Sequence, residues 1–183
     1  PTMEEKQEDK KSFAELENLV ATGAKVQTIF SDAAQKIDSR FGEADSFIKK
    51  AEAITGKKPF LTIKESEVVG PSAMFDLMVI MPCTGNTIAK LANGITDSPV
   101  LMAAKAHLRN ERPLVLCMAS NDALGMNMKN IGLLMNAKNI YFVPFSQDDP
   151  TKKPNSLVAH FGKMTETIKF ALDGKQIQPV LAM

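Results

Sequence analysis

Apolar runs alternate along the chain with stretches in which apolar positions recur every three or four residues. The runs at 75–81, 113–118 and 140–143 have the length and composition of strands buried on both faces of a parallel sheet. Shorter runs at 26–30 and 59–63 also predict strands. Strands that alternate with helices predict an α/β fold, in which an open parallel sheet carries helices on both faces.

Helices are predicted where the apolar spacing changes to three and four and where capping residues flank the stretch. Gly23 ends the first of them, Gly56 ends the second, and Gly70 with Pro71 marks a turn. No repeat or linker divides the chain, so we expect one domain over residues 1–183, with residues 1–12 as a polar and flexible lead-in. The later helices are expected at about 43–55, 86–93, 98–109, 127–136 and 155–172.

Composition narrows the classes of partner. Across the 183 residues the net charge is +1, which gives no reason to expect a nucleic acid or an anionic membrane as partner. The longest apolar runs are too short to span a bilayer and the polar start is not a signal peptide, so a cytoplasmic location is expected. Two cysteines without a nearby His/Cys cluster predict neither a disulfide scaffold nor a metal site.

The strand at 75–81 is followed by polar residues that open a helix. Pro82 has no N–H and is expected to end the strand. Thr84, Asn86 and Thr87 offer hydroxyls, an amide and unpaired backbone N–H groups, and Gly85 lets a ligand approach the main chain. Such a helix start favours phosphate or carboxylate. The simpler alternative is that Thr84 or Asn86 only caps the helix.

A longer pattern points to a family. P-C-T-G-N-T-I-A-K-L-A-N-G-I-T-D, residues 82–97, resembles the block P-x-S/T-x-N-T-x-A-K-x-A-x-G-x-x-D of the FMN-binding flavoproteins, which include phosphopantothenoylcysteine decarboxylases and flavin prenyltransferases. The resemblance implies a three-layer, flavodoxin or Rossmann-like sheet, FMN as cofactor and a homo-oligomer. The resemblance also assigns six residues to the flavin site: Pro82, Cys83, Thr84, Gly85, Asn86 and Thr87. Among them, Asn86 is the catalytic candidate.

Segments 98–116, 120–125 and 139–159 resemble one branch of that family, the small subunits of two-subunit oxidoreductases that make a pyridine dicarboxylate during spore formation. The resemblance implies a dehydrogenase-like partner that brings a nicotinamide cofactor, a small dicarboxylate substrate, and a location in the mother cell of a sporulating bacterium. Two alternatives stay open. One is a stabilising subunit without flavin, and the other is an FMN-dependent decarboxylase or prenyltransferase that acts alone.

Two further loops should join 82–87 at the carboxyl ends of the strands. In loop 118–127, Ser120 and Asn121 are candidate flavin or substrate contacts, with an Asx turn or a cap as the alternative. In loop 144–156, Lys152 and Lys153 could bind a dianionic substrate, although a solvated loop in which Asn155 or Ser156 caps the last helix is the simpler interpretation.

Two remaining features qualify the site. The nearby helix start is expected to lower the pKa of the Cys83 thiol, although lining a ligand is a better role for it than redox chemistry. Members of the family begin with a central strand and a T-G-S-type loop at the flavin phosphate. Residues 1–11 contain no apolar run, so the usual first strand is missing from the pattern, and half of the phosphate cradle with it.

Overall fold

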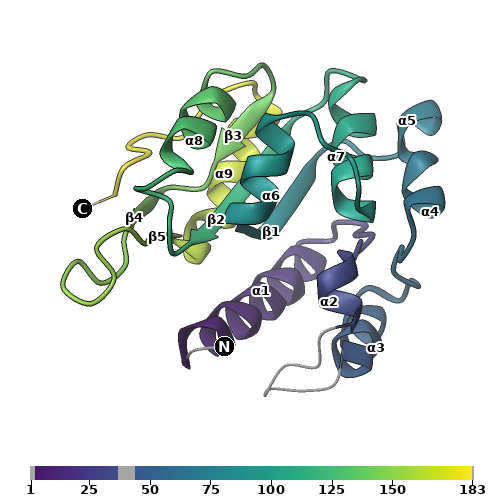
Figure 1. Cartoon of the computed structure of the whole chain (residues 1–183). Helices are drawn as coiled ribbons and strands as arrows, with labels where there is room; N and C mark the ends of the chain where they lie inside the picture. Colours follow the sequence, from purple (N-terminus) through teal and green to yellow (C-terminus); the bar gives the residue numbers. More distant parts are fainter. Residues whose placement is uncertain (1–2, 37–43, 183) are drawn as a thin grey trace.

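The computed structural model describes residues 3–36 and 44–182, and a five-stranded mixed sheet lies at its centre (Figure 1). β1 and β3 run parallel to β2, whereas β5 runs antiparallel to the end of β2 and to β4. The predicted open sheet is therefore confirmed, with an antiparallel pair added to its parallel part. The strands are β1 (Met78–Thr84), β2 (Leu114–Ser120), β3 (Ile140–Phe142), β4 (Phe145–Gln147) and β5 (Leu157–Ala159).

β2 is the central strand, and all of its residues are buried. β1 covers one edge, from Met78 opposite Leu114 to Thr84 opposite Ala119, with a shift of register between Ile80 and Cys83. β3 and β5 share the other edge of β2, one beside its beginning and one beside its end. A continuous apolar strand such as β2 requires cover on both faces, which the helices supply.

The helices lie on both faces of this sheet. In Figure 1, α6, α7 and α8 lie in front of the strands and α9 lies behind them, while α1 to α3 form a group below. α6 and α8 pack against each other, α6 beside β1 and β2 and α8 beside β3. The helices are α1 (Met3–Ala21), α2 (Asp32–Lys36), α3 (Ala44–Thr55), α4 (Ile63–Glu67), α5 (Val69–Ser72), α6 (Gly85–Ala92), α7 (Pro99–Leu108), α8 (Met128–Met135) and α9 (Met164–Leu172), with a 3-10 turn η1 (Phe161–Lys163).

Several predicted boundaries are wrong. The segments 26–30 and 59–63 form no strands, because only one bridge, between Ile29 and Phe60, joins them. Pro82 does not end β1, which runs on to Thr84 past the register shift. A proline fits there because the ladder is already interrupted and needs no donor.

The two ends of the described chain also differ from expectation. α1 already begins at Met3, so the polar lead-in is largely helical. The predicted helix 155–172 starts only at Met164, because the apolar residues of β5 pair with β4 instead. Asn155 and Ser156 therefore do not cap it. Gly70 and Pro71 lie in α5 and not in a turn.

Among the described residues β1 has β2 as its only strand neighbour.

Candidate functional site

The candidate site begins where β1 passes into α6. Thr84 is extended, and its hydroxyl accepts a hydrogen bond of 3.5 Å from the Thr87 N–H and lies 3.2 Å from the Thr87 hydroxyl. Thr84 is thus the N-cap of α6. Asn86 is exposed, and its side chain forms no hydrogen bond within the described part of the chain. Its amide is therefore available to a ligand.

Gly85 lies against side chains from the far side of the junction. A Cβ on this residue would lie 2.6 Å from the Ser120 hydroxyl, 2.7 Å from Asp122 Oδ1 and 2.8 Å from Asn127 Nδ2. A real Cβ essentially never lies this close to another heavy atom, and the Ser120 and Asn127 side chains cannot move away without breaking their hydrogen bonds to Asp122. Glycine is needed here because the protein's own polar groups approach the main chain, where the sequence suggested a ligand.

These polar groups form a network at the end of β2. The Ser120 hydroxyl donates to Asp122 Oδ1 at 2.6 Å, and Asn127 Nδ2 donates to the two carboxylate oxygens at 3.0 and 2.9 Å. Both side chains, that of Ser120 first, hold the pKa of the Asp122 carboxyl below its ordinary value through these hydrogen bonds. Asp122 is therefore ionised at neutral pH.

The charge of Asp122 sets the direction of the whole network. An ionised carboxylate only accepts hydrogen bonds, so Asn127 must turn its N–H groups toward Asp122 and its oxygen away. That oxygen accepts a hydrogen bond of 2.9 Å from Asn130 Nδ2. Asn130 is then left with its Oδ1 in the interior, where no described residue donates to it, although only 5% of the residue is exposed.

The structure brings together the three loops that the sequence placed at the carboxyl ends of the strands. Thr84 lies opposite Ala119, and Ser120 lies opposite Leu157. The Leu124 N–H also donates to the Asn155 carbonyl at 3.0 Å, which joins loop 118–127 to the loop between β4 and β5. Asn121 in the middle loop is exposed and, like Asn86, forms no side-chain hydrogen bond among the described residues.

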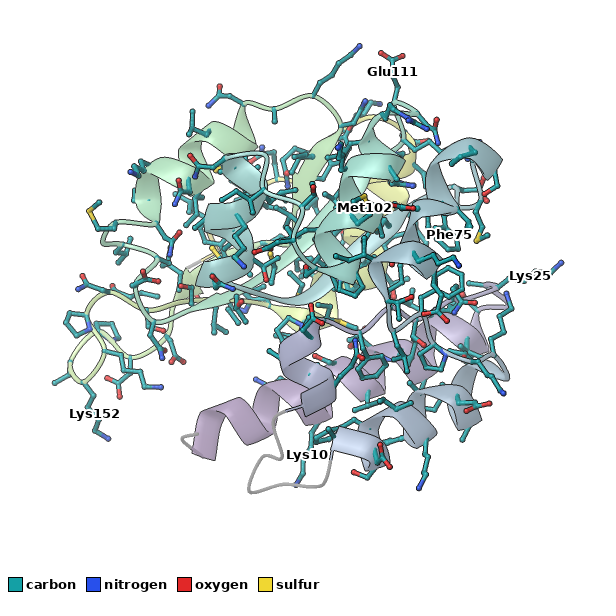
Figure 2. The ribbon with its side chains drawn as sticks, turned by 45° about the vertical axis from the view of Figure 1, so that its right-hand side comes forward. Lys10, Lys25, Phe75, Met102, Glu111 and Lys152 are labelled. Atoms are coloured by element: carbon teal, nitrogen blue, oxygen red, sulfur yellow. The ribbon has the colours of Figure 1, made fainter. Side chains whose placement is uncertain are left out.

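The two lysines lie outside the network. Lys153 Nζ is 3.5 Å from Asp148 Oδ2, and about a quarter of each side chain is exposed. Lys152 is 84% exposed, and its ammonium is 4.0 Å from Asp149 Oδ2. Figure 2 shows Lys152 at the tip of the loop, pointing away from the body of the molecule. Its role, and that of Lys153, in holding a dicarboxylate stays a prediction.

Cys83 is buried and does not have the expected thiolate character. Its side chain is fully buried, and burial raises the pKa of the thiol to about 12. The expected lowering by the start of α6 is wrong, because loss of hydration disfavours the thiolate more strongly. Any contact of Cys83 with a ligand would come from its backbone. Pro82 is half-buried beside it.

Sequence reasoning missed Asn127 and Asn130 and gave no role to Asp122. One signal was present. Asn127 and Asn130 are three residues apart in M-N-M-K-N-I, so they lie on the same helical face as the buried Ile131 and Leu134. Two amides on an otherwise apolar face require polar partners, which indicates a buried network.

Neither a metal cluster nor a membrane-spanning helix occurs in the described part of the chain. Over 3–36 and 44–182, no group of three or more His, Cys, Asp or Glu side chains is arranged to hold a metal ion. In the same residues, no helix combines the length and the apolar character needed to cross a membrane.

Known proteins share both the sequence and the fold. Over 169 residues, 92% of this chain and 84% of the relative, the sequence is 49% identical to the B subunit of dipicolinate synthase from Bacillus subtilis (strain 168). The chain is also 29% identical to the flavin prenyltransferase UbiX of Thermoplasma acidophilum. That alignment of 119 residues covers 65% of this chain and 64% of the relative.

A solved structure supports the same relationship. The crystal structure of the dipicolinate synthase B subunit from Bacillus halodurans C superposes with a TM-score of 0.86 at 48% identity, over 93% of this chain and 88% of that one. The model of the Flavoprotein family matches residues 11–169, a range that contains the whole strand-end network. The chain therefore belongs to the flavoprotein family.

Proposed function

We propose that this chain is the B subunit of a dipicolinate synthase. With a dehydrogenase-like A subunit it would complete the oxidation of a dihydrodipicolinate-type precursor to pyridine-2,6-dicarboxylate in the mother cell during spore formation. The observation that carries the proposal is the 49% identity to one such relative over 92% of this chain. All three loops of the candidate site lie within the family match.

FMN is the cofactor that the family suggests, and the site fits its uncharged part. The exposed amides of Asn86 and Asn121 can each donate and accept a hydrogen bond, as the edge of a flavin ring requires. Thr87 and the backbone of Pro82 and Cys83 line the same junction. When bound, FMN supplies an acceptor for two electrons and a proton. Of the two asparagines, Asn86 lies on α6 and is the candidate for direct contact with the reacting molecule.

The residues at the site hold and orient a ligand better than they move protons. Asp122 is the acid of the network, and its lowered pKa makes it a weak base. His107 is 1% exposed in α7 with its Nε2 2.9 Å from the Pro113 carbonyl, and burial lowers its pKa. Neither His107 nor Asp122 is thus set up as a general base. The family resemblance assigns the hydride acceptor to a nicotinamide cofactor on the A subunit, and bound FMN would take electrons only in an enzyme that acts without that subunit.

One observation favours a second candidate, a stabilising role for this chain without any bound flavin. The start of α6, where the sequence predicted a phosphate or carboxylate ligand, already faces the protein's own Asp122 carboxylate. An internal anion at that place removes part of the reason to expect FMN phosphate there.

An activity assay separates these candidates. The purified chain, the A subunit and their mixture are supplied with a reconstituted precursor, with and without FMN, and the ultraviolet absorbance of pyridine-2,6-dicarboxylate is followed. We expect product from the mixture and little from either component alone. Product from this chain with FMN alone would contradict the proposal and favour a self-sufficient flavin enzyme. If the mixture has the same activity with and without added FMN, the stabilising role is favoured.

We also expect this chain to form a homo-oligomer, as the family resemblance implies. Light scattering of the purified chain measures its mass directly. A monomer of 20.0 kDa at micromolar concentration would contradict that expectation.

A further inference from the structure

α8 and the turn before it present an apolar face to solvent. Met126 is 74% exposed, which is the highest fraction for any large apolar residue in the described part of the chain. The α8 face, as we call it, consists of five exposed apolar side chains: Leu124, Met126, Met128, Leu133 and Met135. The solvent side of a surface helix ordinarily carries charged and polar residues, so this face departs from the usual pattern.

A comparison with α3 shows the difference. α3 exposes Asp45, Lys49 and Lys50, whereas Lys129 is the one charged residue of α8. In Figure 1, α8 ends the row of helices in front of the sheet, and α6 lies between α8 and α7. No described helix other than α6 makes an extensive contact with α8. The α8 face is thus left open to another molecule.

The attachment of α8 to the sheet does not need these side chains. Ile131 and Leu134 are buried and supply that attachment. An exposed apolar patch of about 300–600 Å² is often an interaction site in a soluble protein. Three of the five side chains belong to methionines, whose flexible thioethers adapt well to a binding partner. The α8 face therefore has the character of an interaction surface.

Two charges on either side of Met126 have no partner of opposite sign. Asp122 precedes Met126 in the turn and Lys129 follows it in the first turn of α8. Both residues are exposed, and within the described ranges neither lies at salt-bridge distance from an opposite charge. The first turn of α8 contains no acidic residue, and a cation there opposes the helix dipole. Lys129 would be stabilised by a carboxylate that comes from outside the chain.

This pattern of charges is complementary to itself. In a two-fold symmetric interface, the contact that one residue makes with a second is repeated with the two protomers exchanged. An axis beside Met126 brings the two Met126 side chains together and places each Lys129 opposite Asp122 of the partner subunit. A partner with a purely acidic or purely basic surface would satisfy one of the two charges and repel the other.

We propose that the α8 face joins two copies of this chain about a two-fold axis beside Met126, with Lys129 of each copy paired to Asp122 of the partner subunit. A stable interface buries about 800 Å² on each partner, so the five apolar side chains form its centre and neighbouring polar residues its rim. The inference gives a surface to the homo-oligomer expected above. It requires neither a bound flavin nor the A subunit.

The first test compares the same substitution on two helices. Sedimentation equilibrium gives the dissociation constant of self-association for the unchanged chain, for Met126→Lys and for Leu172→Lys. Leu172 is 54% exposed on α9, which lies on the other face of the sheet. Met126→Lys should weaken association by about a hundredfold or more, because it places two cations together at the axis. Leu172→Lys should change it by no more than about threefold.

Three results of this test would overturn the proposal. They are a monomeric unchanged chain, a Met126→Lys variant that associates as tightly as the unchanged chain, and equal losses in the two variants. Circular dichroism and urea denaturation of each variant show whether it is folded.

A charge reversal tests the ion pair without weakening the fold. Lys129→Glu puts an acid in the first turn of α8, which favours the helix, but sets it opposite Asp122 of the partner subunit. Association should weaken by about tenfold at low salt and by less at high salt. Lys169→Glu, exposed on α9, is the control with the same change of net charge. An effect of Lys129→Glu no greater than that of Lys169→Glu would contradict the pairing.

The A subunit is the other possible occupant of the α8 face. If the unchanged chain is monomeric and Met126→Lys abolishes its binding to the A subunit, the face belongs to that subunit and the proposal falls. Failure of the proposed function is a separate result, because sedimentation needs neither substrate nor A subunit. A chain that makes no pyridine dicarboxylate in the mixture, yet loses self-association in Met126→Lys and not in Leu172→Lys, would support the inference alone.

Discussion

Two polar loops meet at the carboxyl end of β2, and they use their charges differently. In loop 120–127, Asp122 is held by buried donors from the end of β2 and from the start of α8. In the loop between β4 and β5, Asp148 pairs with Lys153, and Asp149 Oδ1 accepts from the backbone of Thr151 and Lys152. The donors to Asp122 are buried side chains, whereas Asp148 and Asp149 are held by a lysine and by backbone N–H groups of their own loop. Polar residues in site loops thus differ in the support beneath them, which a sequence does not display.

The largest effect should come from filling the space beside Gly85. Gly85→Ala pushes a Cβ into the Ser120, Asp122 and Asn127 network, and we expect a loss of about 1–3 kcal/mol in the free energy of unfolding. Ligand binding at the α6 start should be lost with it. Gly132→Ala in α8 is the control, because its Cβ meets nothing within 4 Å. It should be neutral or stabilise by up to about 1 kcal/mol. Urea denaturation that finds both variants equally stable would contradict this account.

The next effect tests the buried support of Asp122. Asn127→Ala removes two contacts to the carboxylate and leaves Asn130 Nδ2 without its acceptor, which should cost about 1–3 kcal/mol. Asn136→Ala, at the other end of α8, loses one exposed hydrogen bond to the Gly132 carbonyl and should cost less than about 1 kcal/mol. Thermal denaturation of the two variants compares them. A greater loss for Asn136→Ala would mean that the network does not anchor the loop.

The pH dependence of the Asp122 contribution follows from its lowered pKa. Because the folded-state pKa lies below the unfolded value, the stabilisation is present above the ordinary pKa of aspartate, about 3.9, and is lost as the pH falls through the folded value. The difference in unfolding free energy between the unchanged protein and Asp122→Asn should therefore shrink between about pH 4 and lower values. A difference that stays constant down to about pH 2 would show that the carboxylate is not held as described.

The smallest effects are expected in the self-contained loop. Lys152→Ala should change stability by less than about 1 kcal/mol, since an exposed ion pair contributes little. Lys153→Ala should cost more than Lys152→Ala, because only about a quarter of the Lys153 and Asp148 side chains is exposed. If these lysines hold the dianionic substrate, as the sequence predicts, the double variant raises the KM of the two-subunit enzyme. The rise should be greater at low salt, because salt screens exposed charges. An unchanged KM would remove both lysines from the site.

The strongly patterned elements could be predicted from the sequence, and the contacts between distant residues could not. β2, α6, α7 and α8 lie within one or two residues of their predicted ranges, because each has a long apolar pattern with a clear cap or a buried run. The runs 26–30 and 59–63 have strand composition, yet they reach only each other through one bridge. Leu157 to Ala159 form a strand because β4 and the end of β2 lie beside them.

At the site, the sequence indicated the junction of β1 and α6 and the gathering of three loops. It could not show that Asp122, Asn127 and Asn130 form one chain against Gly85, because their meeting depends on how α8 packs on α6. It also misjudged the Cys83 thiol, since a pKa responds to burial that the local sequence does not fix.

Hydrogen exchange of the full chain with and without bound flavin tests the central claim, that the ligand site is the junction of β1 and α6 with loop 120–127. Riboflavin or FMN should slow amide exchange in peptides that cover residues 82–92 and 118–128, with little change over α1 and α3. Protection confined to α1 and α3, with residues 82–92 and 118–128 unchanged, would contradict it.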